Sequence, residues 1–375
     1  MNKIIRYFTM LILFMSLFIQ TGCWDQKQYE EIGFILQMGL EVGKDDKMLL
    51  SITAPVVSPD AEKKVEFLNI SNENLVRPSR DNLRNVSGKF LQGGKIQILY
   101  FSKELAEKGI NEYLEIFHRD PENPLLSNVV VVDKSPKEMM EKSIDFKDKP
   151  RPSIYAAELL RDARRRLIIP ETRVYNFSIL YHSKTIDPVT PLFRYDDKSF
   201  IVSGAAVFSG DKMVGEINPD ETKLLNVLKG KKQVFEYIYR GNALNNKDGK
   251  LKKGAAVSLK CKKNKIKIDT SSKKPVINIT LRFIASMDEF SGKQNLDKDH
   301  QLKKVERVIA ESLYREINDL LKKLQSFGAD PIGFGERVRA KQNSYWKSVK
   351  WKEVYKTAQI KLNIGVEFET YGTIR

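Results

Sequence analysis

The strongest constraint on the fold is an apolar stripe that runs the length of residues 302–327. Apolar side chains recur there at steps of three or four residues, which is the spacing of one face of an α-helix. Gly328 follows directly and suits a helix C-cap. Such a long one-faced helix must be covered by other elements. The stripe consists of Leu302, Val305, Ile309, Leu313, Ile317, Leu320, Leu324 and Phe327.

Two alternating segments flank this helix and predict the strands that it covers. Residues 276–284 place every second side chain on an apolar face, and residues 359–368 do the same. One face of the terminal strand must therefore pack on helices, while the other meets solvent or a partner. The C-terminal part of the chain is thus predicted to be α+β.

The N-terminal part interleaves short strand and helix patterns, and the fold class expected for the whole chain is α+β. The expected strands are 32–40, 48–57, 95–101, 128–132, 201–208 and 213–217, and the expected helices are 79–91, 102–118, 136 onward, 152–167 and 219–228. Residues 255–269 predict a second hairpin with Lys263 and Asn264 at its tip. Because residues 183–198 alternate poorly and carry two prolines, we place a domain boundary there. The expected domains are an N-terminal α/β domain over residues 23–197, a middle domain with hairpins over 198–270 and a C-terminal α+β domain over 271–375.

The first 22 residues have the layout of a lipoprotein signal peptide. Lys3 and Arg6 precede an uncharged apolar run over residues 7–19. That run of 13 residues is short for a bilayer, which needs about 20. Thr21-Gly22 and then Cys23 close the segment in the form of a lipobox. We therefore predict that residues 1–22 are cleaved and that Cys23 is acylated, the alternative being a thiol that happens to lie at a cleavage site.

The chain carries a formal net charge of +16, and much of it lies in one segment. Residues 247–274 hold eleven lysines against Asp248 and Asp269. Two interpretations stay open, a solvated face or a surface for anionic lipid headgroups or an acidic partner. No aromatic residue lies between these lysines, so the stacking that helps nucleic-acid binding is absent and no nucleic-acid partner is expected. The candidate surface residues are Lys260, Lys262, Lys265 and Lys267.

No catalytic residue, metal site or cofactor is predicted. Nucleotide-binding glycine motifs, a nucleophile elbow and a zinc-protease motif are all missing from the sequence. His118 and His182 are each interpreted as surface or capping histidines, with His182 near the end of a strand. Cys261, the second of two cysteines, is expected to be a small apolar strand residue.

Several short motifs, taken in order, resemble one known family. Cys23-Trp24-Asp25 resembles the start of the C subunits of spore germinant receptors, the Ger(x)C lipoprotein family. The resemblance covers essentially the whole chain. It continues at residues 39–45, 101–110, 117–122 and 204–215, at Asp330-Pro331-Ile332-Gly333-Phe334-Gly335-Glu336, and at Tyr345-Trp346-Lys347 and Trp351.

The resemblance implies a function that composition alone does not. It implies a lipid-anchored, non-enzymatic subunit of a nutrient receptor at the outer face of the spore inner membrane, required for germination. The implied partners are two integral membrane subunits, A-type and B-type, and the lipid bilayer through acylated Cys23. The implied architecture is three domains, each a sheet flanked by helices. The alternative is an extracytoplasmic solute-binding lipoprotein, which would need a deep cleft with a few convergent polar groups.

Overall fold

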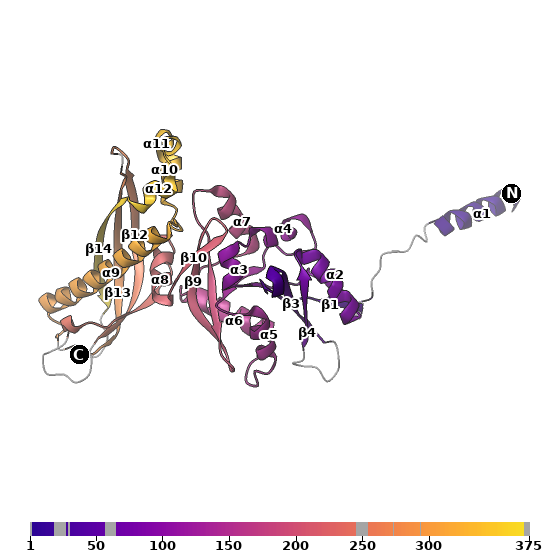
Figure 1. Cartoon of the computed structure of the whole chain (residues 1–375), viewed down its shortest axis with the longest axis horizontal. Helices are drawn as coiled ribbons and strands as arrows, with labels where there is room; N and C mark the ends of the chain where they lie inside the picture. The colour runs from indigo at the N-terminus through magenta and orange to yellow at the C-terminus, as the bar shows by residue number, and fades with distance from the viewer. Residues whose placement is uncertain are drawn as a thin grey trace.

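The computed structural model describes residues 2–18, 28, 31–56, 65–244, 254–272, 274–292 and 294–370. Two large sheets, one of eight and one of four strands, organise these residues (Figure 1). Helix α1 (Asn2–Phe18) precedes them, and its side chains from Lys3 to Ser16 are all exposed. The expectation of a mixed α+β chain with helix-flanked sheets is confirmed.

The eight-stranded sheet has a parallel centre and antiparallel flanks. Its order is β10-β9-β8-β7-β6-β2-β3-β4, and strands β2, β6, β7 and β8 run parallel. The bounds are β2 Gln37–Val42, β3 Met48–Pro55, β4 Val65–Glu73, β6 Ile98–Ser102, β7 Asn128–Val132, β8 Val189–Tyr195, β9 Phe200–Ser209 and β10 Lys212–Ile217. A separate parallel pair joins β1 (Ile32–Phe34) to β5 (Phe90–Gln92).

Helices cover both faces of this sheet, which explains the continuous apolar run of β7. Val129 and Val131 pack with the first helix group, while Val130 and Val132 pack with the second. A strand buried on both faces has no polar side to alternate with. The first group is α2 (Val76–Ser87), α3 (Lys103–Lys108), α4 (Asn111–Arg119) and α7 (Val174–Ser183); the second is α5 (Pro136–Ile144) and α6 (Pro152–Arg165).

Two helix starts follow the local sequence, whereas the helix expected over residues 79–91 begins earlier, at Val76, and ends at Ser87. The Ser102 hydroxyl accepts a hydrogen bond from the Leu105 backbone N–H at 3.2 Å and caps α3 as expected. The Ser135 hydroxyl accepts one from Glu138 N–H at 3.0 Å and caps α5. These bonds satisfy backbone donors that the first helical turn leaves unpaired.

The four-stranded sheet has the order β11-β12-β13-β14 and is covered on one face by the long helix α9 (Figure 1). Its strands are β11 (Phe235–Tyr239), β12 (Ala255–Asp269), β13 (Val276–Phe290) and β14 (Gln359–Thr370), and α9 spans Asp299–Phe327. Six of the eight residues of the predicted apolar stripe are buried there, and Leu302 and Phe327 at its two ends are partly buried. Gly328 ends α9 in the left-handed conformation with φ of 66°. Helices α10 (Phe334–Lys341), α11 (Asn343–Ser348) and α12 (Trp351–Lys356) complete the crossover to β14.

One apolar core joins the two sheets. It takes Val207 from β9 and Ile217 from β10, and it continues through α8 (Pro219–Leu228) into the strands and helix of the C-terminal sheet. Gly215 of β10 lies so close to Phe327 of α9 that an added Cβ would meet the ring at 2.4 Å. Helices α8 and α9 therefore bridge the two sheets within one core.

Strand pairing crosses both expected domain boundaries. β8 and β9 pair across residue 198, and β12 and β13 pair across residue 270. The described part of residues 198–270 is divided, with β9 and β10 in the eight-stranded sheet and β11 and β12 in the other. In these residues there is no sheet confined to the expected middle domain.

The hairpin expected within residues 255–269 is wrong. β12 is one strand of 15 residues, and Lys263 and Asn264 pair with Arg282 and Leu281 of β13 instead of forming a turn. A register shift between Cys261 and Lys263 reverses which residues face the helix, so the alternation breaks without the strand ending.

Candidate functional site

Two loops that are far apart in the sequence meet between the sheets. Asp187 lies between α7 and β8, and Asp330 follows the end of α9. The Asp187 backbone N–H donates to the Asp330 carbonyl oxygen at 3.1 Å, and the Asp330 N–H donates to Asp187 Oδ2 at 2.8 Å. Each aspartate thus fixes the backbone of the other.

The Asp330 side chain organises the Asp-Pro-Ile-Gly-Phe-Gly-Glu segment around itself. Its carboxylate accepts hydrogen bonds from the backbone N–H groups of Gly333, Phe334 and Gly335 at 2.9, 3.0 and 2.7 Å. Trp351 Nε1 donates a fourth bond at 3.0 Å. Asp330 thereby satisfies the first backbone donors of α10 and holds α12 against them.

Burial gives this carboxyl an unusual titration. Burial raises the pKa of Asp330 to about 6, while the hydrogen bonds from Gly335 and its neighbours oppose the rise. Lys229 lies nearby and donates from Nζ to the Pro331 carbonyl oxygen at 2.7 Å. Burial lowers the pKa of Lys229 to about 8. At pH 7 a larger fraction of each group is therefore uncharged than for an exposed aspartate or lysine.

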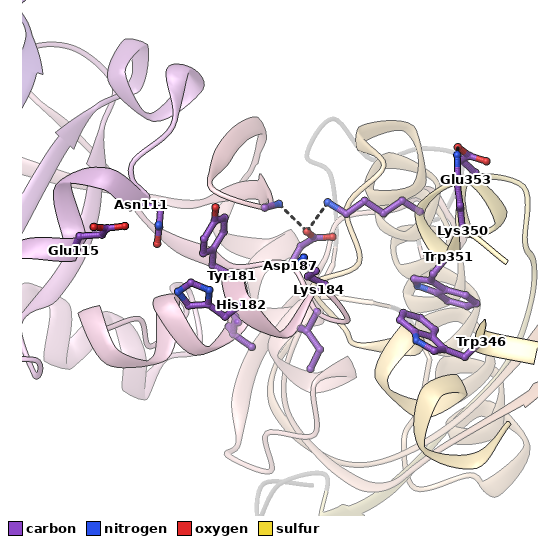
Figure 2. A pocket seen from close by; sticks show the side chains of 14 residues that line it. Asn111, Glu115, Tyr181, His182, Lys184, Asp187, Trp346, Lys350, Trp351 and Glu353 are labelled. Atoms are coloured by element: carbon purple, nitrogen blue, oxygen red, sulfur yellow. Dashed lines mark hydrogen bonds and ion pairs between the residues drawn. The ribbon is translucent and has the colours of Figure 1, made fainter. Parts of the chain in front are cut away.

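The Asp187 side chain ties the β9–β10 turn to helix α12. Its Oδ1 accepts from the Gly210 N–H at 2.9 Å and pairs with Lys352 Nζ at 3.3 Å (Figure 2). Lys352 Nζ also donates to the Ser209 hydroxyl at 2.8 Å. These contacts join the N-terminal sheet to the C-terminal crossover.

A cleft of about 730 Å³ opens beside these loops. Trp346 and Trp351 form its aromatic wall, with ring centroids 6.2 Å apart, and Tyr181 and His182 face them from α7 (Figure 2). Charged side chains stand at the rim. They include Glu115, Lys184, Lys350, Lys352 and Glu353. An aromatic wall with cations and carboxylates at the rim suits the binding of a small polar molecule or of a partner's loop.

His182 lies on helix α7, so its expected place near a strand end is wrong. In the described part of the chain, no hydrogen bond joins His182 to a nucleophile or a carboxylate; its ring packs edge-on against Tyr181 at 4.9 Å. His118 instead bonds Ser178 Oγ through Nε2 at 2.7 Å, which links α4 to α7.

The four lysines predicted as a surface all lie on β12 and are exposed. The structure places Lys260, Lys265 and Lys267 on the sheet face away from α9, and Lys262 at the strand's register shift. This surface is separate from the cleft. Cys261 points the other way and is buried in the core, as expected of an apolar strand residue.

Cys23 lies outside the described residues, so its acylation stays a prediction. Among the helices that are described, none is long and apolar enough to cross a membrane. The described histidine, cysteine, aspartate and glutamate side chains form no group suited to hold a metal ion.

Sequence reasoning missed the aspartate pair that builds the site. The available signal was the segment from Asp330 to Glu336, where an acid precedes two closely spaced glycines. Gly333 adopts a positive φ of 79°, and a Cβ on Gly335 would meet Trp351 Nε1 at 2.6 Å. Those requirements explain the residue types, yet nothing local identifies Asp187 as the partner.

Comparison with known proteins places the whole chain in one family. The model described as "Spore germination protein N-terminal domain" matches residues 25–195, and "Spore germination B3/GerAC like, C-terminal" matches residues 203–372. The chain is 23% identical to spore germination protein GerQC of Bacillus cereus, over 96% of this chain and 98% of that one. It is 22% identical to spore germination protein B3 of Bacillus subtilis, over 97% of each chain.

A solved structure shares the fold. The crystal structure of the GerBC protein superposes with a TM-score of 0.57 at 16% identity, covering 88% of this chain and 96% of that one. The two family models meet near residue 198, where the first boundary was expected, although β8 and β9 pair across it. The chain therefore belongs to the GerAC-like family of spore germination proteins, as the resemblance had indicated.

Proposed function

We propose that this protein is a lipid-anchored, non-enzymatic subunit of a nutrient germinant receptor at the outer face of the spore inner membrane. The observation that carries the proposal is the match of both family models, in order, to nearly the whole chain. The lipobox supports the anchor, because Cys23 follows a basic start and an apolar run. Two or three acyl chains on one residue give stable anchoring where a single chain is marginal.

The proposed partners are an A-type and a B-type integral membrane subunit. Exposed apolar side chains on and beside α7 are candidates for docking, because large exposed apolar patches mark interaction sites. Leu126 is 63% exposed and Ile179 is 62% exposed. Tyr175, on the same side of α7 as Ile179, is 40% exposed. The Tyr175 backbone N–H bonds the Leu125 carbonyl oxygen, which brings the loop before β7 to this helix.

The decisive experiment is affinity purification of the native chain from detergent-solubilised spore membranes, followed by mass spectrometry. We expect a diacylglyceryl-modified Cys23 peptide together with two multi-spanning membrane proteins. Cys23→Ala should release the chain from the membrane fraction and impair germination, whereas Cys261→Ala should leave the fractionation unchanged. Recovery of the chain alone, with an unmodified N-terminus, would contradict the proposal.

The cleft between the loops favours one second candidate, a solute-binding lipoprotein that captures a nutrient itself. Its aromatic wall and charged rim are of the kind such a function needs. A ligand at 100 times its dissociation constant stabilises a protein by about 2.7 kcal/mol. Thermal unfolding across amino acids and sugars should then show a shift that Trp346→Ala abolishes. An unchanged melting temperature with every compound would remove this candidate.

A further inference from the structure

Six basic side chains gather on the face of the four-stranded sheet that α9 leaves uncovered. Their neighbours at alternate positions, such as Ile277 and Leu281, are buried on the α9 side, which fixes the direction of the set. We name this set the basic face. It consists of Lys260, Lys263, Lys265 and Lys267 of β12, Arg282 of β13 and Lys361 of β14.

The strand register brings these residues together. Lys263 stands opposite Arg282, and Lys267 stands opposite Asn278, which in turn pairs with Lys361. Residues two apart on a strand are about 7 Å apart and neighbouring strands about 4.8 Å apart. The positive charges therefore form a row along β12, and Arg282 and Lys361 extend it onto β13 and β14.

The positive charges are concentrated along one part of this face, from Lys263 to Lys267 and across to Lys361. In the described part of the chain, none of the six residues makes an ion pair. Acidic side chains share the face, with Asp269 at one end of β12 and Glu236, Asp288 and Glu367 toward the other end. Like charges placed directly opposite each other, as at Lys263 and Arg282, destabilise a sheet. An anionic surface laid against this row would offset the repulsion.

Arg282 is held in place at a hollow in this face. Its NH1 group donates to the Leu281 and Asn363 carbonyl oxygens at 2.9 and 3.1 Å. Gly365 beside it makes room, because a Cβ there would meet Arg282 Cδ at 2.9 Å. The hollow has a volume of about 620 Å³, and its lining includes Lys262, Lys263 and Glu367. A fixed guanidinium flanked by two lysines suits a phosphate group.

We propose that the basic face docks on the anionic phospholipid headgroups of a membrane. Nucleic acid fits it poorly, because no aromatic side chain projects from the described part of this face to stack on bases. An acidic protein fits it less well than lipid, because protein interfaces are depleted of lysine and enriched in aromatic residues at their centres. Lysines spread over an open sheet face with asparagine and threonine between them match a wet anionic surface.

This inference rests on the proposed function for the nearness of a membrane. Cys23 precedes the first strand of the N-terminal part, whereas the basic face lies in the C-terminal sheet at the opposite end of the described body (Figure 1). The acylated cysteine would supply attachment and the basic face would supply orientation.

The test uses a chain of residues 24–375, which lacks Cys23. Because the described α1 side chains are exposed and contribute nothing to the three apolar cores, this chain keeps every sheet intact. It should sediment with vesicles of equimolar phosphatidylglycerol and phosphatidylcholine and not with phosphatidylcholine alone. Raising the salt from about 50 mM to about 500 mM should release it. Changing Lys263, Lys265 and Lys267 together to Gln should lower the partition coefficient by roughly one to two orders of magnitude.

The matched control changes Lys303, Lys304 and Lys322 to Gln. These three exposed lysines lie on α9, on the other side of the same sheet, and their replacement removes the same amount of charge. The control should bind like the wild-type chain, and neither variant should unfold at a lower temperature than the wild-type chain. Equal loss in the two variants, or no loss in the β12 variant, overturns the proposal.

Failure of the wild-type chain to bind anionic vesicles, with loss of a co-purifying protein in the β12 variant, would assign the face to an acidic protein instead. Neither result bears on acylation of Cys23, which the membrane-fraction experiment tests.

Discussion

Asp187 and Asp330 exchange hydrogen bonds over a separation of 143 residues, the carboxylate of the first accepting from the backbone of the second at 2.8 Å. The contact joins the strand that follows Asp187 to the crossover that follows Asp330. It therefore connects the two family-defining halves of the chain through buried polar groups. Such bonds stabilise strongly only when every member is satisfied.

Replacing Asp330 with Ala should destabilise the chain strongly. The change removes the acceptor of four hydrogen bonds and leaves three backbone N–H groups and Trp351 Nε1 buried without a partner. Each unsatisfied buried donor costs about 1–3 kcal/mol. Urea unfolding should show a loss of at least about 3 kcal/mol. Asp319→Ala, at an exposed position of α9, is the control and should change stability by less than about 0.5 kcal/mol.

The stability of the wild-type chain should fall as the pH rises from about 4 to about 6. The pKa of Asp330 is raised by burial from 3.8 to about 6 in the folded chain, so the folded state binds more protons in this window. The stabilisation from protonated Asp330 is complete below the pKa of this group in the unfolded chain and is lost as the pH rises through its pKa in the folded chain. The free energy of unfolding should fall by about 3 kcal/mol over this range. Asp330→Asn should abolish this component of the unfolding free energy. Equal pH slopes for the variant and the wild type would contradict the assignment to Asp330.

Much of the fold follows from sequence wherever a pattern is long and one-sided. The α9 stripe and the alternation of β14 are such cases, and both elements formed where expected. The hairpin expected within residues 255–269 was a wrong prediction because a bulge in β12 reverses the alternation of buried and exposed side chains, as a turn would. Helix α7 was missed because it is apolar on several sides, with Phe177 buried and Ile179 exposed.

The site was harder to predict than the fold. Asp330 lay within a recognised motif, but its role depends on donors that fold back onto it and on Asp187 from a distant loop. No spacing rule joins residues so far apart. The lysine surface was foreseen only in part, because Arg282 and Lys361 join it through strand register, which the sequence does not display.

Trp351→Phe should cost more stability than Trp346→Phe. The two indoles lie together, but Trp351 Nε1 donates to the buried Asp330 carboxylate at 3.0 Å. Phenylalanine keeps the ring contact and loses that bond, for which about 1.5–3 kcal/mol is expected because the acceptor is charged. Thermal unfolding of the two variants compares them directly. Equal losses would show that the indole hydrogen bond contributes nothing beyond packing.

Leu313→Asp should unfold the C-terminal sheet, because it places a carboxylate where no part of the side chain is exposed. Its neighbour Tyr314 is 45% exposed on the same helix, so Tyr314→Asp should leave the melting temperature within a few degrees of wild type. Near-ultraviolet circular dichroism should report lost tertiary packing in the first variant only. A folded Leu313→Asp chain would mean that the apolar stripe of α9 does not face the sheet.

Helix α12 contributes a buried tyrosine hydroxyl near the Asp330 carboxylate. Tyr355 of α12 is fully buried, and its hydroxyl has no hydrogen-bond partner among the described residues. Burial and the nearby Asp330 carboxylate raise the pKa of this hydroxyl well above its ordinary value. A buried polar group without a partner costs free energy, so removing it should not destabilise the chain. Tyr355→Phe should therefore unfold at the same temperature as wild type or higher, since the ring contacts with Trp351 and Phe334 remain. A loss above about 1 kcal/mol would mean that an ordered water bonds the hydroxyl.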